Sequence, residues 1–165
     1  LNGKSLGVKP KPADDAPRAW RVPFEPGTLV AVGRNGGREV AKHELRTAGA
    51  PAKLVATVNR TTLARNWDTV AFVTVQAVDA NGVPCAGADT LVTFSIEGPG
   101  AIAGVDNGNR GDPAPYQATE RRLYLGECIA IVKATEDSGA ITLTASAQGI
   151  ASATVKLAVA AAAAP

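Results

Sequence analysis

Short segments in which apolar and polar residues alternate occupy most of the sequence after position 50. The clearest are residues 70–79 (VAFVTVQAVD) and 90–97 (TLVTFSIE). A period of two directs one apolar row towards a core and leaves the other row mostly polar, as in a half-buried β-strand. Between the two segments, Asp79-Ala80-Asn81-Gly82 is typical of a turn, because Gly82 can adopt a positive φ. The pattern therefore predicts two strands around which the rest of the chain is built.

Further segments of this kind follow at the spacing of a β-sandwich. The predicted strands span residues 52–58, 70–79, 90–97, 101–104, 127–133, 140–147 and 151–159. Seven short strands, all expected to be antiparallel, fit an immunoglobulin-like β-sandwich. A long polar loop over residues 105–125 interrupts the series.

The first 48 residues predict a smaller sheet of roughly four strands that lacks at least one more. Strands are expected at residues 19–24, 29–33 and 39–46, with a turn at Asn35-Gly36-Gly37 between the last two. Asn2-Gly3 is also a strong hairpin signal, yet the strand that should precede it is reduced to Leu1. We expect this hairpin to be cut, its first strand being either part of a longer protein or lost.

The predicted organisation is thus an all-β chain in three parts. A truncated immunoglobulin-like unit covers residues 1–48, an immunoglobulin-like β-sandwich covers residues 49–160, and residues 161–165 form a disordered tail. Charge supports the division. Residues 1–53 contain ten Lys/Arg and five Asp/Glu (+5), whereas residues 54–165 contain seven and ten (−3).

Composition limits which residue types can form the core and which classes of partner the chain can bind. The chain is 45% hydrophobic but only 4% aromatic, so the core must consist mainly of Val, Leu, Ile and Ala. The basic residues are scattered rather than gathered in a stripe with aromatics, which argues against nucleic-acid binding. No apolar run is long enough for a membrane span. Because the sequence contains no methionine and starts at Leu1, we expect an excised piece of a longer protein.

No catalytic motif is present in the sequence. The single histidine, His43, has no cysteine or carboxylate at metal-ligand spacing, and we expect neither a metal nor a cofactor. Glu97, Glu120 and Glu127 could in principle supply the carboxylate pair of a glycosidase. Nothing in the pattern places two of them across a cleft, so solvated charges explain them better.

The two cysteines, Cys85 and Cys128, are predicted to be free thiols. The strand assignment places them at opposite ends of the sandwich, about 17–20 Å apart, whereas a disulfide needs Cα atoms within about 7 Å. Cys128 shares a face with Ala130 and Val132 and should behave as a small buried hydrophobe. The disulfide is the alternative if the strand assignment is wrong.

The most informative polar stretch is residues 104–112 (GVDNGNRGD). Asp106, Asn107, Asn109 and Asp112 offer oxygen ligands for Ca²⁺ or hydrogen bonds for a sugar. Asp, Asn and Gly also satisfy backbone groups in tight loops. The spacing does not match an EF-hand, so the structural interpretation is favoured, while the length of the loop keeps a binding role open.

Several motifs together resemble a known family. The segment WRVPFEPGTL (residues 20–29) and the following Asn-Gly-Gly hairpin resemble the immunoglobulin-like domain after the catalytic barrel in bacterial glycoside hydrolase family 2 β-galactosidases. The second unit is similar to a further C-terminal domain of these enzymes. Its matching motifs are AFVTV (71–75), DANG (79–82), VTF (92–94), GPG (98–100), GVDNGN (104–109) and GECIAIV (126–132). Departures are Cys85, which replaces a plain turn residue, and the loop at residues 110–116.

The resemblance implies a part of a sugar hydrolase without its active site. The catalytic glutamates of the family lie on an upstream (β/α)₈ barrel, and no position here corresponds to them. We therefore expect a non-catalytic accessory module in carbohydrate metabolism, with the missing barrel as its partner and a periplasmic or secreted parent. The alternatives are a carbohydrate-binding module that uses the 106–112 loop with Trp67 or Tyr116, and an adhesin-type spacer.

Overall fold

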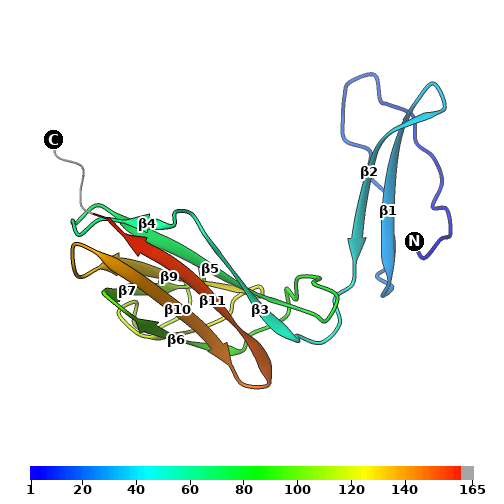
Figure 1. Ribbon diagram of the computed structural model, residues 1–165. Helices are drawn as coiled ribbons and strands as arrows, with labels where there is room; N and C mark the ends of the chain where they lie inside the picture. The colour runs from blue at the N-terminus through cyan, green and yellow to red at the C-terminus, as the bar shows by residue number, and fades with distance from the viewer. Residues whose placement is uncertain (161–165) are drawn as a thin grey trace. The chain divides into compact units, whose positions relative to one another are not determined.

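The computed structural model describes residues 1–160 and divides the chain into two compact units, Leu1–Thr47 and the part from Ala48 onward (Figure 1). The disordered tail predicted at residues 161–165 lies outside the described residues. All regular elements within residues 1–160 are strands. They are β1 (Thr28–Asn35), β2 (Arg38–Arg46), β3 (Lys53–Val58), β4 (Thr62–Leu63), β5 (Val70–Val78), β6 (Leu91–Glu97), β7 (Gly100–Asp106), β8 (Glu120–Arg122), β9 (Glu127–Ala134), β10 (Gly139–Ala147) and β11 (Ile150–Val159).

The second unit is a β-sandwich, as predicted. Its strands are hydrogen-bonded in the order β7-β9-β5-β3-β11-β10-β6-β8, and β4 pairs with β11. Strands β7, β9, β5 and β3 form one layer and β11, β10, β6 and β8 the other. The layers are joined where β3 and β11 run side by side, with Lys53 opposite Ala151.

The core lies between these layers and is almost entirely aliphatic. On β5, Ala71, Val73, Val75 and Ala77 are fully buried, and the residues between them point outwards. Strands β6, β10 and β11 supply the opposite side, with Phe94 as the aromatic side chain of the buried cluster in the described residues. The alternation in the sequence therefore reports the inner faces of the sandwich correctly.

The predicted strands of the second unit all correspond to observed ones, with ends that differ by at most two residues. Two short strands, β4 and β8, were not predicted, because two or three residues cannot show a period of two. The expectation that all strands are antiparallel is wrong for β11, which runs parallel to β3 and β4. The reason is that β11 lies where the two layers meet. Its neighbours β3 and β4 come from a distant part of the chain, so no hairpin forces them to be antiparallel to it.

The first unit contains a single hairpin, in which β1 pairs with β2 across the predicted Gly36-Gly37 turn. The strand expected at residues 19–24 is absent from the structure, and the forecast of roughly four strands is wrong: the described residues of this unit form two. Pro23 has no N–H for a ladder, and Phe24 is 83% exposed. Val22, Pro23 and Phe24 instead line a pocket beside the β1–β2 hairpin.

Both cysteines are free and buried, which confirms the free-thiol prediction. The reason given for it is wrong. Cys85 N–H donates to Ala77 O at 2.9 Å, and Cys128 lies opposite Val75, so both cysteines adjoin the same end of β5. Burial raises the pKa of the Cys85 thiol, and it raises that of Cys128 to about 12. Neither is therefore a thiolate nucleophile at neutral pH.

Candidate functional site in the 106–112 loop

The loop containing the four predicted site residues leaves the sandwich at the end of β7 and returns to it at β8. Asp106 is the last residue of β7 and lies opposite Ile129 of β9. The structure brings Asp106, Asn107, Asn109 and Asp112 together in one compact segment, as the sequence suggested.

No helix within residues 1–160 is long and apolar enough to cross a membrane.

Each of the four predicted side chains in the loop accepts a hydrogen bond from a backbone N–H two residues further along the chain. Asp106 Oδ1 accepts from Asn107 N (2.7 Å) and Gly108 N (3.1 Å). Asn107 Oδ1 accepts from Asn109 N at 3.0 Å, and Asn109 Oδ1 accepts from Gly111 N at 3.0 Å. Asp112 Oδ1 accepts from Ala114 N at 2.9 Å. This succession of Asx turns supplies the acceptors that an irregular backbone needs.

Arg121 of β8 holds the loop from the inside. Its side chain is 1% exposed, and its Nη1 donates to Asp112 Oδ2 (3.1 Å) and Ala114 O (3.2 Å). Its Nη2 donates to Val105 O (3.2 Å) and Pro115 O (2.8 Å). The guanidinium also lies 5.4 Å from the ring centroid of Tyr116. A planar fork of donors suits several converging carbonyls, which a lysine could not match.

Sequence reasoning missed Arg121. A charged residue at an inward strand position cannot be distinguished by pattern from its exposed neighbour Arg122. The one available signal was its place two residues before Leu123, which is itself 3% exposed. Shared strand parity would have put both side chains on the inner face.

The charge arrangement favours the structural interpretation of the loop over a cation site. Hydrogen bonds from Ala114 N, Arg121 and Asn107 hold the pKa of Asp112 below its usual range. Both of its carboxylate oxygens already accept hydrogen bonds, and the positive charge of the Arg121 guanidinium, 3.1 Å from Oδ2, opposes a second cation beside it. Among the described residues, no three His, Cys, Asp or Glu side chains lie close enough together to hold a metal ion. A ligand for this loop stays a prediction.

The two aromatic candidates for sugar binding lie on different loops. Trp67 precedes β5 and is 93% exposed, whereas Tyr116 is 61% exposed and its carbonyl accepts from Val105 N at 2.8 Å. Tyr116 is thus held beside the loop of Asp106–Asp112. Trp67 belongs to a different loop, the one between β4 and β5.

The remaining titratable candidates do not converge. His43 is an exposed residue of β2 opposite Ala31. Glu120 lies opposite Thr93, and Glu97 is four residues further along β6, about 13 Å away at the rise of a strand. Glu127 belongs to the other layer and accepts a hydrogen bond from Gln76. A retaining or inverting glycosidase places its carboxyl groups about 5–9.5 Å apart, so these glutamates do not form such a pair.

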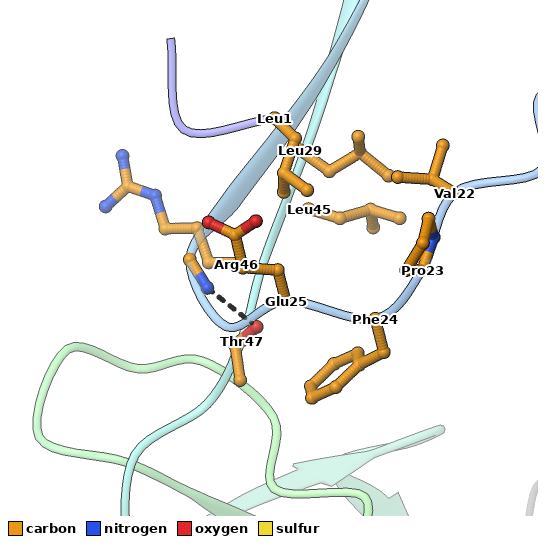
Figure 2. A pocket seen from close by; sticks show the side chains of 10 residues that line it. Leu1, Val22, Pro23, Phe24, Glu25, Leu29, Leu45, Arg46 and Thr47 are labelled. Atoms are coloured by element: carbon orange, nitrogen blue, oxygen red, sulfur yellow. Dashed lines mark hydrogen bonds between the residues drawn. The ribbon is translucent and has the colours of Figure 1, made fainter. Parts of the chain in front are cut away.

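A pocket of about 390 Å³ lies in the first unit, where the sequence predicted a strand (Figure 2). Leu29 and Leu45, a cross-strand pair, form its floor, and Leu1, Val22 and Phe24 form much of its wall. Gly27 N–H donates to Thr47 Oγ1 at 3.1 Å at one end. The lining is mainly apolar, and its polar side chains are those of Glu25, Arg46 and Thr47.

Comparison with known proteins identifies the family. Residues 54–156 match the glycoside hydrolase family 2 C-terminal domain 5. The chain belongs to glycoside hydrolase family 2. Residues 1–41 match a domain of unknown function, DUF4982. The resemblance seen in the sequence motifs is thus confirmed.

The chain is similar to parts of longer bacterial proteins. It is 40% identical over 157 residues to the β-galactosidase BoGH2A of Bacteroides ovatus, a match that covers 95% of this chain and 18% of the relative. A β-galactosidase of Thermoanaerobacter pseudethanolicus is 31% identical, covering 75% of this chain and 15% of that protein. The crystal structure of a family 2 member from Bacteroides cellulosilyticus superposes with a TM-score of 0.89 at 32% identity, covering 96% of this chain and 21% of that one. The chain therefore spans about a fifth of the length of these relatives.

Proposed function

We propose that this chain is a non-catalytic C-terminal accessory module of a β-galactosidase-like family 2 glycosidase that acts in carbohydrate metabolism. The observation that carries the proposal is the match to the Bacteroides ovatus β-galactosidase, which spans 95% of this chain but only 18% of the relative. The module has two parts, the hairpin unit and the β-sandwich. Its principal partner is the catalytic barrel of the parent chain.

The chemistry of the described residues supports a structural role. The candidate carboxylates do not converge, both cysteines have raised pKa values, and the polar loop uses its side chains to satisfy its own backbone. Such an arrangement is suited to holding a shape next to a catalytic domain.

Hydrolysis of a nitrophenyl β-galactoside tests the proposal. The purified chain is expected to give no turnover above a buffer blank, while the Bacteroides ovatus relative serves as the positive control. Turnover that scales with chain concentration and survives a further purification step would overturn the non-catalytic role.

One observation favours a second candidate function, carbohydrate binding. Trp67 is 93% exposed next to Asn66 and Asp68, and an exposed indole flanked by polar side chains is suited to stacking on a sugar ring. Titration calorimetry with galactosides would show heat that disappears in Trp67→Ala and persists in Tyr116→Ala if Trp67 carries binding. Absence of heat from the unsubstituted chain would eliminate this candidate.

A further inference from the structure

The outer surface of the layer formed by β7, β9, β5 and β3 carries apolar side chains that the core does not use. In an antiparallel sheet with one face on the core, the other face normally presents polar residues to water. Here the outward positions of β3, β5 and β9 include Val55, Phe72, Ile129 and Ile131. Phe72 is 43% exposed and Val55 40%, and the two isoleucines are half-buried. We call these four residues the outer apolar face.

The residues of this face are neighbours in the sheet. Phe72 lies directly opposite Ile131, and Ile129 lies opposite Thr74. On the other side of β5, Val55 lies diagonally across from Thr74. Side chains directly opposite one another have Cβ atoms about 4.5–5.5 Å apart. The outer apolar face is therefore one patch across three strands, and contiguous patches of this kind mark interaction surfaces.

Charged residues border the outer apolar face. Glu127 and Lys133 point outwards near the two ends of β9, and Lys53 does so at the start of β3. Protein interfaces have this anatomy, with an apolar centre and a polar rim.

The other layer of the sandwich has a different outer surface. Its strand β10 directs Thr142, Thr144 and Ser146 outwards, and Thr144 Oγ1 lies 3.4 Å from Thr154 Oγ1 of β11. Leu91, at the start of β6, lies at one end of that surface. Both layers enclose the same core, so the fold alone does not account for phenylalanine and isoleucine on the outside of β5 and β9.

We propose that the outer apolar face is the surface on which the β-sandwich docks against the catalytic barrel of its parent chain. The inference rests on the proposed function, which makes that barrel the partner. The match to the Bacteroides ovatus relative covers only 18% of that protein, so a parent of similar length tethers a much larger mass to this chain. A tethered partner has an effective concentration on the order of millimolar, which favours it over a free second copy.

The neighbours of Phe72 favour a protein over a sugar as the occupant. A sugar site needs several convergent polar groups beside the stacking ring. Phe72 faces Ile131 on one side, and on the other side Asn59 Oδ1 already accepts from Phe72 N at 2.8 Å. Aliphatic and aromatic side chains without free polar groups are suited to burial against another apolar protein surface.

Alkylation of introduced cysteines by iodoacetamide tests the docking. Phe72→Cys on the outer apolar face and Thr93→Cys on the outside of β6 are each made in the 165-residue chain and in its full-length parent. Both are exposed positions on strands with a neighbour on either side. Phe72→Cys should react about tenfold or more slowly in the parent, because the reagent reaches a docked face only when the domains separate. Thr93→Cys should react at the same rate in both chains.

Two outcomes of this comparison would overturn the proposal. One is an equal rate for Phe72→Cys in the two chains. The other is a rate in the 165-residue chain that falls as its concentration rises, which would assign the face to a second copy.

A charge on the same face should release it. In the parent that carries Phe72→Cys, Ile131→Glu should restore the fast rate, because docking would bury an unpaired carboxylate. Thr144→Glu is the matched control, since Thr144 is also a half-buried outward residue, and it should leave the rate slow. The buried Cys85 and Cys128 stay unreactive in a folded sandwich. Where they show that Ile131→Glu unfolds, Ile129→Glu makes the same test. Equal rates in the two glutamate variants would contradict the assignment of this face.

Photo-cross-linking identifies what covers the face. p-Benzoylphenylalanine in place of Phe72 in the parent should form adducts with peptides of the barrel in the same polypeptide. Adducts with another domain, or between two copies, would overturn the choice of partner. Because these measurements do not read hydrolysis, the face can prove open while the accessory role stands. Turnover by the 165-residue chain would overturn that role without changing the labelling rates.

Discussion

In the second unit, β5 buries every second side chain completely, whereas in the first unit β1 and β2 bury none. Both regions offer apolar side chains on one face of paired strands, Leu29 and Leu45 in the first unit and Val73 and Val75 in the second. The difference lies in whether a second layer faces them: β5 has β6, β10 and β11 across the core, and the β1–β2 hairpin has only the segment around Val22 to Phe24. Alternation therefore shows which face of a strand is suited to burial, and the presence of a second layer decides whether burial takes place.

The sharpest test of this comparison removes one leucine from each unit. Leu143→Ala, at a position that is 1% exposed, should lower the free energy of unfolding by about 2–5 kcal/mol, because it leaves a cavity in a closed core. Leu45→Ala, at a 57% exposed position, should change it by less than about 0.5 kcal/mol. Urea unfolding followed by circular dichroism measures both.

Comparable losses for the two leucines would contradict the distinction between a closed and an open unit.

The second test concerns the buried cation that organises the 106–112 loop. Arg121→Ala should lower the free energy of unfolding by about 3 kcal/mol, since it leaves the carbonyls of Val105 and Pro115 without their donor. Arg122→Ala is the matched control, because this neighbouring side chain is exposed and donates only to Asp89 O at 3.0 Å. Its effect should stay within about 0.5 kcal/mol.

If the loop instead binds a ligand, Arg121→Ala would remove binding without a large loss of stability. Equal effects of the two arginine substitutions would show that burial of Arg121 contributes little.

The strands of the sandwich could be predicted from the sequence because they bury one face against a complete layer. Residues 70–79 and 127–133 show this directly, and they lie side by side as β5 and β9. β8 could not be predicted, because its inward residue is Arg121, whose partners come from a loop that folds over it. The error at residues 19–24 has the opposite cause: Trp20, Val22 and Phe24 alternate, yet no neighbouring strand offers them hydrogen bonds.

The sequence could predict which polar residues gather in the candidate loop, but not what their side chains bind. Asp106, Asn107, Asn109 and Asp112 were identified as polar residues close together in one loop. Which oxygens remain free depends on backbone N–H directions, which the sequence does not reveal. The cysteine prediction shows the same limit: the thiols are free, but the turn after β5 brings Cys85 back beside Ala77 rather than away from Cys128.

The smallest expected effect is a change of stability with pH. It is tested on one carboxylate from each unit, Asp79 and Glu44. Asp79 is 4% exposed and accepts hydrogen bonds from Gly49 N (2.9 Å), Val83 N (2.8 Å) and Asn81 N (2.9 Å), which hold its pKa below the usual range. Arg46 lowers the pKa of the more exposed Glu44 in the first unit. Replacement by the amide removes the charge in each case.

Because the folded pKa of Asp79 lies below its unfolded value, its stabilisation is present above the unfolded pKa and is lost as pH falls through the folded pKa. The urea midpoint of Asp79→Asn should therefore be lower than that of the unsubstituted chain at pH 7, and the gap should narrow between about pH 4 and pH 2. Glu44→Gln has the same sign, but water and salt screen its ion pair, so its midpoint should follow the unsubstituted chain at every pH. A gap for Asp79→Asn that stays constant down to pH 2 would show that the shape of the side chain, and not its charge, holds the Gly49 segment against the sandwich.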